Sequence, residues 1–279
     1  MFGVFCYYVM SVIKVQNISK HFGSLKAVDD LSFEVQAGQV FGFLGQNGSG
    51  KSTTIRMLLS LIHPTSGQIE IFGKRIEKDR EAILEQVGAI IERPDLYPYL
   101  SAREHLELFA KVRKQKIGEA DINATLEKVG LAHRAKDKVQ TFSLGMKQRL
   151  GIGIALVHNP SLIILDEPTN GLDPNQIIEI RNVVKEIGQQ KTVLLSTHIM
   201  QEVEALCSRV ILIHKGNILQ DCPIEEFKGK WDWKILSENE NLPWSEDFIE
   251  KFKNDTTTII IGSSWPKDEE LLLNFINST

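Results

Sequence analysis

Eight consecutive residues have the types and spacing that are needed to hold a phosphate group. Residues 45–52 read GQNGSGKS and match the pattern G-x-x-x-x-G-K-[ST]. The glycines let the backbone wrap so that successive N–H groups point inward at an anion. An apolar run at 39–44 precedes the stretch and a helical pattern at 53–61 follows it, so a helix N-terminus adds partial positive charge. The sequence therefore predicts a phosphate-binding loop.

The side chains of this loop are suited to a nucleoside triphosphate with a divalent cation. Lys51 is expected to reach the β- and γ-phosphates, and the Ser52 hydroxyl is expected to ligate Mg²⁺. The other candidate contacts to the nucleotide are small or polar: Gly45, Asn47, Gly48, Ser49, Gly50 and Thr53. The predicted ligands are therefore ATP and Mg²⁺.

Two adjacent carboxylates follow an apolar run at residues 162–165. Asp166 stands where the run ends, which is the edge at which α/β sheets bind ligands, and phosphoryl transfer needs a carboxylate there to hold Mg²⁺. Glu167 is placed to polarise an attacking water. An acidic pair at a strand end is common by itself. Beside a phosphate-binding loop, however, the metal and base roles are favoured.

The elements that must position these residues alternate between strands and helices. Unbroken apolar runs at 162–165, 192–195 and 210–213 are typical of strands buried on both faces, with helical stretches between them. This pattern predicts an α/β core with a mostly parallel sheet. Strand-like segments at 12–18 and 31–35 have no helix between them, so an antiparallel β subdomain is expected at the N-terminus.

The chain divides by composition into a large domain and a small appendage. We expect a nucleotide-binding domain over 11–228, with a helical subdomain at about 93–158. All four tryptophans lie after residue 228, together with one strong strand pattern at 256–261, which predicts a small α+β appendage over 229–279. The apolar start of the chain is interpreted as an over-long reading-frame start or as a short hydrophobic arm.

Bulk properties narrow the class of function. A net charge of -4 argues against a broad nucleic-acid footprint, so no nucleic-acid partner is expected. Three scattered cysteines favour reduced thiols over a disulfide or a zinc site. No run of about 20 apolar residues is present, so nothing in the sequence is expected to span a bilayer.

Further motifs resemble those of the ABC transporter ATPase family, in order and spacing over about residues 12–220. Residues 141–149 (TFSLGMKQR) resemble the signature motif, with Ser143 and Gly145 at its centre. Residues 166–173 (DEPTNGLD) resemble Walker B running into the D-loop, which ends at Asp173. His198 resembles the switch histidine, and Phe22 resembles the aromatic residue that stacks on adenine. Core packing of Phe22, or His21 in its place, is the less favoured alternative.

The resemblance implies how the chain works and where. It implies an ATPase that powers a transporter through a separate transmembrane permease subunit, with membrane contact only through that partner. Two copies are expected to form a head-to-tail homodimer in which Ser143 and Gly145 of one copy contact the γ-phosphate bound by the other. His198 is expected to hold Glu167 and water in line. The implied location is cytoplasmic, peripheral on the inner face of the cell membrane.

The sequence departs from the family at two positions that matter for its branch. Glu92 stands where the family has Gln, and the signature motif reads Ser-Leu-Gly-Met. Both features resemble the bacitracin- and lantibiotic-exporter-like (ABC-2 type) branch, which implies export of a peptide antibiotic or other amphiphilic cargo. Glu92 is therefore a candidate metal ligand and catalytic residue, since carboxylates are hard, charged Mg²⁺ ligands. Tyr97 and Tyr99 follow it and could couple to the permease or pack locally.

An ATP-gated regulatory or structural module without transport is the alternative function. A regulatory subunit would bind ATP without turning it over. Lys51, Asp166, Glu167 and His198 are all present, so the sequence gives no reason for inactivity. ATP hydrolysis coupled to transport is therefore the favoured function.

Overall fold

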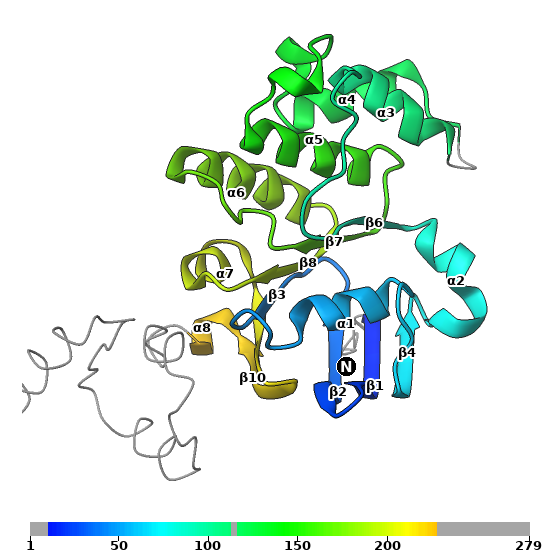
Figure 1. Ribbon diagram of the computed structural model, residues 1–279, viewed down its shortest axis with the longest axis vertical. Helices are drawn as coiled ribbons and strands as arrows, with labels where there is room; N and C mark the ends of the chain where they lie inside the picture. Colours follow the sequence, from blue (N-terminus) through cyan, green and yellow to red (C-terminus); the bar gives the residue numbers. More distant parts are fainter. Residues whose placement is uncertain (1–10, 113–115, 228–279) are drawn as a thin grey trace, which may run out of the picture. The chain divides into compact units, whose positions relative to one another are not determined.

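The computed structural model describes residues 11–112 and 116–227 of the chain (Figure 1). The expectations for the apolar start, for the four tryptophans and for the α+β appendage with its strand at 256–261 lie outside the described residues. The contacts of the described part define one compact unit that ends at Ile224. No helix in these described ranges is long and apolar enough to cross a membrane.

An antiparallel sheet forms the N-terminal part of the unit. Its strand order is β2-β1-β4-β5, and every pairing in it is antiparallel. The bounds are β1 Ser11–Phe22, β2 Leu25–Gln36, β4 Ser66–Ile71 and β5 Lys74–Arg75. In β2, Leu31, Phe33 and Val35 are buried while the residues between them are exposed, as the two-residue period of a strand requires. The predicted antiparallel β subdomain is confirmed.

The second sheet has six strands in the order β10-β9-β3-β8-β7-β6, and all its pairings are parallel except that of β10 with β9. Its strands are β3 Val40–Leu44, β6 Val87–Ile90, β7 Leu162–Asp166, β8 Thr192–Thr197, β9 Arg209–His214 and β10 Asn217–Pro223. Every residue of β7 and β8 is buried, which is why these strands are unbroken apolar runs in the sequence. The predicted mostly parallel core is confirmed.

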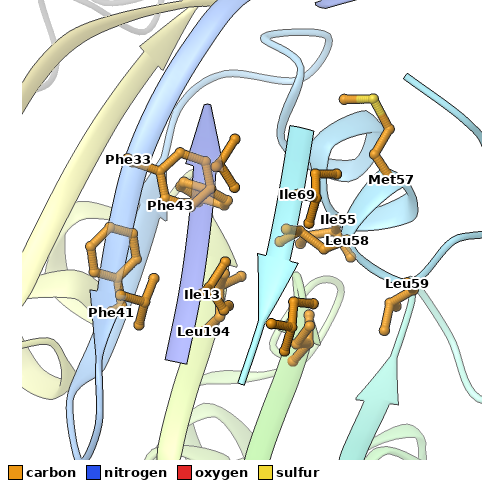
Figure 2. Packing of buried hydrophobic residues seen from close by; sticks show 14 of the residues in the cluster. Ile13, Phe33, Phe41, Phe43, Ile55, Met57, Leu58, Leu59, Ile69 and Leu194 are labelled. Carbon is orange, nitrogen blue, oxygen red and sulfur yellow. The ribbon is translucent and has the colours of Figure 1, made fainter. Parts of the chain in front are cut away.

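Helix α1, Lys51–Leu58, joins the two sheets through one hydrophobic core. Its buried residues Ile55, Met57 and Leu58 pack with side chains from both sheets (Figure 2). Phe33 from the antiparallel sheet meets Phe43 from β3 edge to face, with ring centroids 5.0 Å apart. Because α1 begins at the last residues of the phosphate loop, this packing fixes the direction of that loop.

The remaining helices are α2 Ile76–Leu84, α3 Ala102–Lys111, α4 Glu119–Lys128, α5 Leu144–Leu156, α6 Pro174–Gly188, α7 Met200–Leu206 and α8 Ile224–Phe227, with 3-10 turns η1 Ala132–Arg134 and η2 Val139–Thr141. Helices α3, α4 and α5 form a helical layer, α6 and α7 lie along the parallel sheet, and α2 lies beside β4 of the antiparallel sheet (Figure 1). Helix α5 packs on α3 and α4 and also on β6 and α6. It is therefore buried on most sides and ties the helical subdomain to the core.

Candidate nucleotide-binding and hydrolysis site

A cavity of about 620 Å³ opens at the carboxyl ends of the parallel strands. The loop after β3, the loop after β6 and the residues at the end of β7 all contribute to it. Parallel strands of an α/β sheet end at one edge, where ligands of such folds bind. The start of α5 also reaches the cavity, through Leu144 and Gln148. Four segments that are distant in the sequence thus meet at one site.

The phosphate loop is shaped by glycines that no other residue could replace without strain. Gly50 precedes α1 with φ 108°, a left-handed conformation that L residues rarely adopt. A Cβ on Gly45 would lie 2.4 Å from the backbone oxygen of Ile213 on β9. The loop therefore lies close to the neighbouring strand and turns directly into α1, as a phosphate-binding loop must.

Lys51 is the buried cation of the site, with only 4% of its surface exposed. Its Nζ donates hydrogen bonds to the backbone oxygens of Gly45 at 2.7 Å and Gln46 at 2.9 Å. The same Nζ lies 3.2 Å from Oε1 of Glu167. The ammonium group is thus held across the loop, where the predicted β- and γ-phosphates would lie.

Asp166 ends β7 and is completely buried. Its Oδ1 accepts a hydrogen bond from the Ser196 hydroxyl on β8, while its Oδ2 is buried without a hydrogen-bond partner. A buried carboxylate oxygen with no donor is costly, and a divalent cation would satisfy it. The donor set, with the Ser52 hydroxyl on the same cavity, therefore fits Mg²⁺.

Glu167 lies between a lysine and a histidine. Its Oε1 lies 3.2 Å from Lys51 Nζ, and its Oε2 lies 2.6 Å from His198 Nδ1. The backbone has φ 49°, and its N–H donates to the hydroxyl and the backbone oxygen of Ser196, both at 3.1 Å. A non-glycine residue in this region is strained, and such strain is concentrated at functional sites.

The protonation states of Glu167 and His198 follow from their contact. Burial acts to raise the pKa of Glu167, but the hydrogen bond with His198 and the charge of Lys51 outweigh it and hold that pKa below its ordinary value. The hydrogen bond with Glu167 raises the pKa of His198 against the opposing effect of burial. The carboxylate is therefore ionised at neutral pH, and its contact makes protonation of the imidazole easier than in a free histidine.

Glu92 lines the cavity but its carboxylate is paired with another residue. Its side chain is 65% exposed, and its Oε1 lies 2.5 Å from Nη2 of Arg56 on α1. The backbone has φ 59°, a second strained position at the site. Sequence reasoning did not foresee this pairing, because Arg56 lies on the helix and not in a motif. The metal role of Glu92 stays a prediction.

Seven predicted site residues do not line the cavity of their own chain: Phe22, Gly45, Ser49, Ser143, Gly145, Asp173 and His198. Phe22 ends β1 and is 50% exposed, with Lys20 Nζ 5.2 Å from its ring centroid. Ser143 caps α5, where its hydroxyl accepts from the Met146 N–H at 3.2 Å. Asp173 and Gly145 both lie close to Gln176 in α6.

Asp173 caps α6, because its carboxylate accepts from the Gln176 N–H at 3.0 Å. A Cβ on Gly145 would lie 2.8 Å from the side chain of the same Gln176. The signature turn and the D-loop are therefore packed together at the N-termini of two neighbouring helices. Leu144, which lies between Ser143 and Gly145, lines the same cavity as the phosphate loop.

Several residues of the site were missed in the sequence. Ser196 ties Asp166 to Glu167, and its place two residues before His198 was the available signal. Gln148 is buried, lines the cavity and has an Nε2 without a hydrogen-bond partner. It lies within the signature motif, so its motif membership could have marked it.

A phosphate loop after β3, a buried carboxylate at the end of β7, with β8 between these two strands, and a glutamate–histidine pair are the features of a P-loop ATPase. Residues 28–170 match the family model described as ABC transporter. The chain belongs to the ABC transporter family, and its part in such a transporter is the ATP-binding and ATP-hydrolysing subunit, which uses Mg²⁺.

Three curated relatives are named after transport of, or resistance to, antibiotics. The bacitracin transport ATP-binding protein BcrA of Bacillus licheniformis is 48% identical over 226 residues, 79% of this chain and 72% of that protein. The linearmycin resistance ATP-binding protein LnrL of Bacillus subtilis (strain 168) is 42% identical over 75% of this chain and 68% of its own. The lantibiotic transport ATP-binding protein SrtF of Streptococcus pyogenes is 38% identical over 83% and 98%.

Solved structures show the same fold. The structure of an ATP-binding subunit of an ABC transporter is 29% identical, with a TM-score of 0.70 over 88% of this chain and 100% of that one. The ADP conformation of MJ1267, an ATP-binding cassette of an ABC transporter, is 27% identical with a TM-score of 0.70, over 79% and 94%. These likenesses confirm the predicted α/β ATPase architecture.

Proposed function

We propose that this chain powers a membrane exporter of peptide antibiotics or other amphiphilic molecules, with Glu167 as the general base. One observation carries the catalytic part: the Glu167 carboxylate lies between Lys51 and His198 beside the cavity. Glu167 accepts a proton from the water that attacks the γ-phosphate. Its low pKa keeps it ionised for that step. His198 holds the carboxylate in line and contacts the γ-phosphate.

The phosphate loop binds and neutralises the triphosphate. Lys51 contacts the β- and γ-phosphates, and backbone N–H groups of residues 45–53 surround them. Ser52, Asp166 and Glu92 are the proposed Mg²⁺ ligands. When bound, Mg²⁺ neutralises charge on the phosphate oxygens. Before ATP can meet Lys51 fully, the lysine must exchange its contacts to Gly45 and Gln46 for the phosphate oxygens.

Substitution of Glu167 by Gln tests the catalytic role. The amide keeps the size of the side chain but cannot accept the proton, so kcat should fall by about 100-fold or more. ATP affinity, measured by calorimetry, should remain. Glu127→Gln, an exposed glutamate in α4, is the matched control and should change neither quantity. Wild-type turnover by Glu167→Gln would show that another group is the base.

The arrangement of the signature turn supports a head-to-tail homodimer. Ser143 and Gly145 lie at the N-terminus of α5, where backbone N–H groups and the helix dipole attract an anion. They do not line the cavity of their own chain, so the anion they suit is the γ-phosphate bound by a second copy. Asp173 lies beside them at the same interface, and Phe22 stacks on the adenine.

The proposed membrane partner is a separate permease subunit, which places this chain on the inner face of the cell membrane. Tyr97 and Tyr99 are exposed on the loop after Glu92, with ring centroids 5.9 Å apart. Buried His105 holds this loop, because its Nε2 accepts from the Tyr97 N–H at 2.9 Å and its Nδ1 donates to the Ser101 oxygen at 2.8 Å. Two hydrogen bonds from a buried side chain thus hold this loop in one conformation.

Co-purification tests the partner and the platform together. The chain should retain a polytopic membrane protein, and the double change Tyr97→Ala with Tyr99→Ala should weaken that retention without altering ATP hydrolysis by the free subunit. Retention that survives both changes unweakened would exclude these tyrosines from the contact. The proposed class of cargo is based on the names of the relatives. The antibiotic tolerance of cells that express the complete transporter tests this proposal.

A further inference from the structure

A buried glutamate outside the cavity joins the two segments that carry the proposed acid–base pair. Glu202 lies in α7 and has no exposed surface. Its Oε1 accepts a hydrogen bond from the hydroxyl of Thr169, and its Oε2 accepts one from Thr197 Oγ1 at 2.6 Å. Thr169 follows Glu167 by two residues, and Thr197 immediately precedes His198. One carboxylate therefore links the D-loop segment to the end of β8.

We propose that Glu202 is a positioning residue for ATP hydrolysis, which acts by holding Thr169 and Thr197 so that Glu167 and His198 face each other. This inference rests on the roles proposed above for Glu167 and His198. Glu202 itself touches neither the cavity nor, by the geometry, the reacting atoms.

The hydrogen bonds on Thr197 fix the backbone on both sides of His198. Thr197 Oγ1 donates to Glu202 and accepts from the N–H of Ile199 at 3.0 Å. The Thr197 hydroxyl thus donates its proton to Glu202 and accepts a hydrogen bond from the residue that follows His198. Loss of the Glu202 carboxylate would let the Thr197 hydroxyl rotate, and the backbone on both sides of His198 would then be held less firmly.

The cost of burying a carboxylate argues that its place is functional. Removing an ionised carboxyl group from water is expensive unless donors or a cation satisfy it. Among the ion pairs of the described residues, none includes Glu202, so its oxygens are satisfied by two threonine hydroxyls. An apolar side chain would serve mere packing between α7 and β8 at lower cost. A side chain that accepts two hydrogen bonds at once is needed only if both segments must be held.

Electrostatics points in the same direction. The hydrogen bond with Glu167 is the largest influence on the pKa of His198 and raises it, burial and the charge of Lys51 act to lower it, and the charge of Glu202 makes a smaller contribution that raises it. These three charged groups face the ring from α7, from the end of β7 and from the start of α1. The charge of Glu202 thus acts in the same direction as the hydrogen bond between Glu167 and His198.

Two pairs of threonine variants test the link without removing the glutamate. Thr169→Val and Thr197→Val each delete one hydroxyl at nearly constant volume, whereas Thr169→Ser and Thr197→Ser keep it. We expect each valine variant to lower kcat by about 10- to 100-fold, because small displacements of catalytic groups have effects of this size. KM and calorimetric affinity for ATP should be nearly unchanged, and both serine variants should recover most of the rate.

Glu202→Gln adds a near-isosteric test at the centre of the link. An amide still accepts one hydroxyl proton but presents N–H groups to the other threonine, so kcat should fall while the melting temperature changes little. If the valine and Gln variants only lower the melting temperature, and the folded protein turns over at the wild-type kcat, Glu202 is structural and the inference is wrong.

The Glu167→Gln background separates this inference from the proposed function. Residues that act as a unit are not additive, so Thr197→Val should cause little further loss once Glu167 is disabled. If Thr197→Val lowers kcat by the same factor in the Glu167→Gln background as in the wild type, the positioning role of Glu202 is wrong, while the role of Glu167 as the base is unaffected. If Glu167→Gln alone retains turnover, the base role fails and the positioning role falls with it.

Discussion

The phosphate pocket and the signature turn differ in how completely one chain satisfies them. In the pocket, Lys51 and His198 both contact Glu167, and Asp166 and Glu167 both bond to Ser196. In the signature turn, the Ser143 hydroxyl accepts a hydrogen bond from the Met146 N–H of its own helix. The comparison teaches that the proposed acid–base residues are brought together within one chain, whereas the proposed anion-binding turn would need a second copy to supply its anion.

The largest expected effect on ATPase activity comes from mixing two variants, one with a disabled phosphate loop and one with a disabled signature turn. Lys51→Ala should abolish phosphate binding in one copy, and Gly145→Asp should place a charged side chain where Gln176 packs 2.8 Å from the Cβ position. Each variant alone should lack ATPase activity. A mixture of the two should recover about a quarter of wild-type activity, since half of randomly paired dimers contain one intact site of two.

Two measurements support the interpretation of that mixture. Gly145→Asp alone should still bind ATP, because its own phosphate loop is unaltered. Gly153→Ala in the same helix is the matched control, since a Cβ there meets no atom closer than 3.5 Å, and it should keep full activity. An inactive mixture of two folded, correctly paired variants would show that each copy uses its own signature turn.

Glu92 lines the pocket, and its replacement should have an effect of intermediate size on the Mg²⁺ dependence of activity. A carboxylate near phosphate oxygens repels them unless Mg²⁺ is present, so wild-type activity should depend more steeply on Mg²⁺ than that of Glu92→Gln. ATPase rates and calorimetric affinity for Mg-ATP over a range of Mg²⁺ concentrations measure this. Identical curves would remove Glu92 from the metal site.

Arg56 provides the matched control for that titration. Arg56→Ala leaves the Glu92 carboxylate in place but removes its partner at 2.5 Å. If the ion pair competes with the metal for the carboxylate, Arg56→Ala should move the Mg²⁺ response in the direction opposite to Glu92→Gln. A surface ion pair is weak, so the shift should be small.

The smallest effect concerns two histidines whose pKa values shift in opposite directions. Burial lowers the pKa of His105, so the folded state resists its protonation, and stability is lost as pH falls below the unfolded value of about 6.5. The pKa of His198 is raised, so its contribution is present below about pH 6.5 and is lost as pH rises through its folded pKa. The helical subdomain and the pocket should thus respond to pH with opposite sign.

His105→Gln isolates the helical part of this response. The amide can still accept from the Tyr97 N–H and donate to the Ser101 oxygen, but it does not titrate. Between pH 7.5 and 5.5 the melting temperature of the wild type should fall further than that of His105→Gln, by a few degrees, on the order expected for a small free-energy change. Equal losses would contradict the assignment.

Local patterns were sufficient to predict the elements that hold the pocket. The fully buried strands β7 and β8 are recognisable because both faces need apolar residues, and the phosphate loop is recognisable because its backbone needs glycine. Helix α2 and strand β10 were not predicted. Both are largely polar, and α2 buries only Ile76 and Ile83.

Contacts between distant segments could not be predicted from the sequence. Arg56 meets Glu92, and Glu202 meets Thr169, across 36 and 33 residues of chain. Ser196 reaches Asp166 only because β7 and β8 are neighbours in register. Such contacts depend on strand order, which hydrophobic periodicity does not encode. Motifs predicted which residues do chemistry, whereas the fold shows which other residues contact them.

The mass of Glu167→Gln in saturating Mg-ATP tests the division between the two regions most directly. This variant should bind ATP without consuming it, so light scattering should show a dimer that reverts to monomer when ATP is removed or when Gly145→Asp is added to the same chain. A Glu167→Gln protein that stays monomeric with ATP bound would contradict a site closed by the signature turn of a second copy.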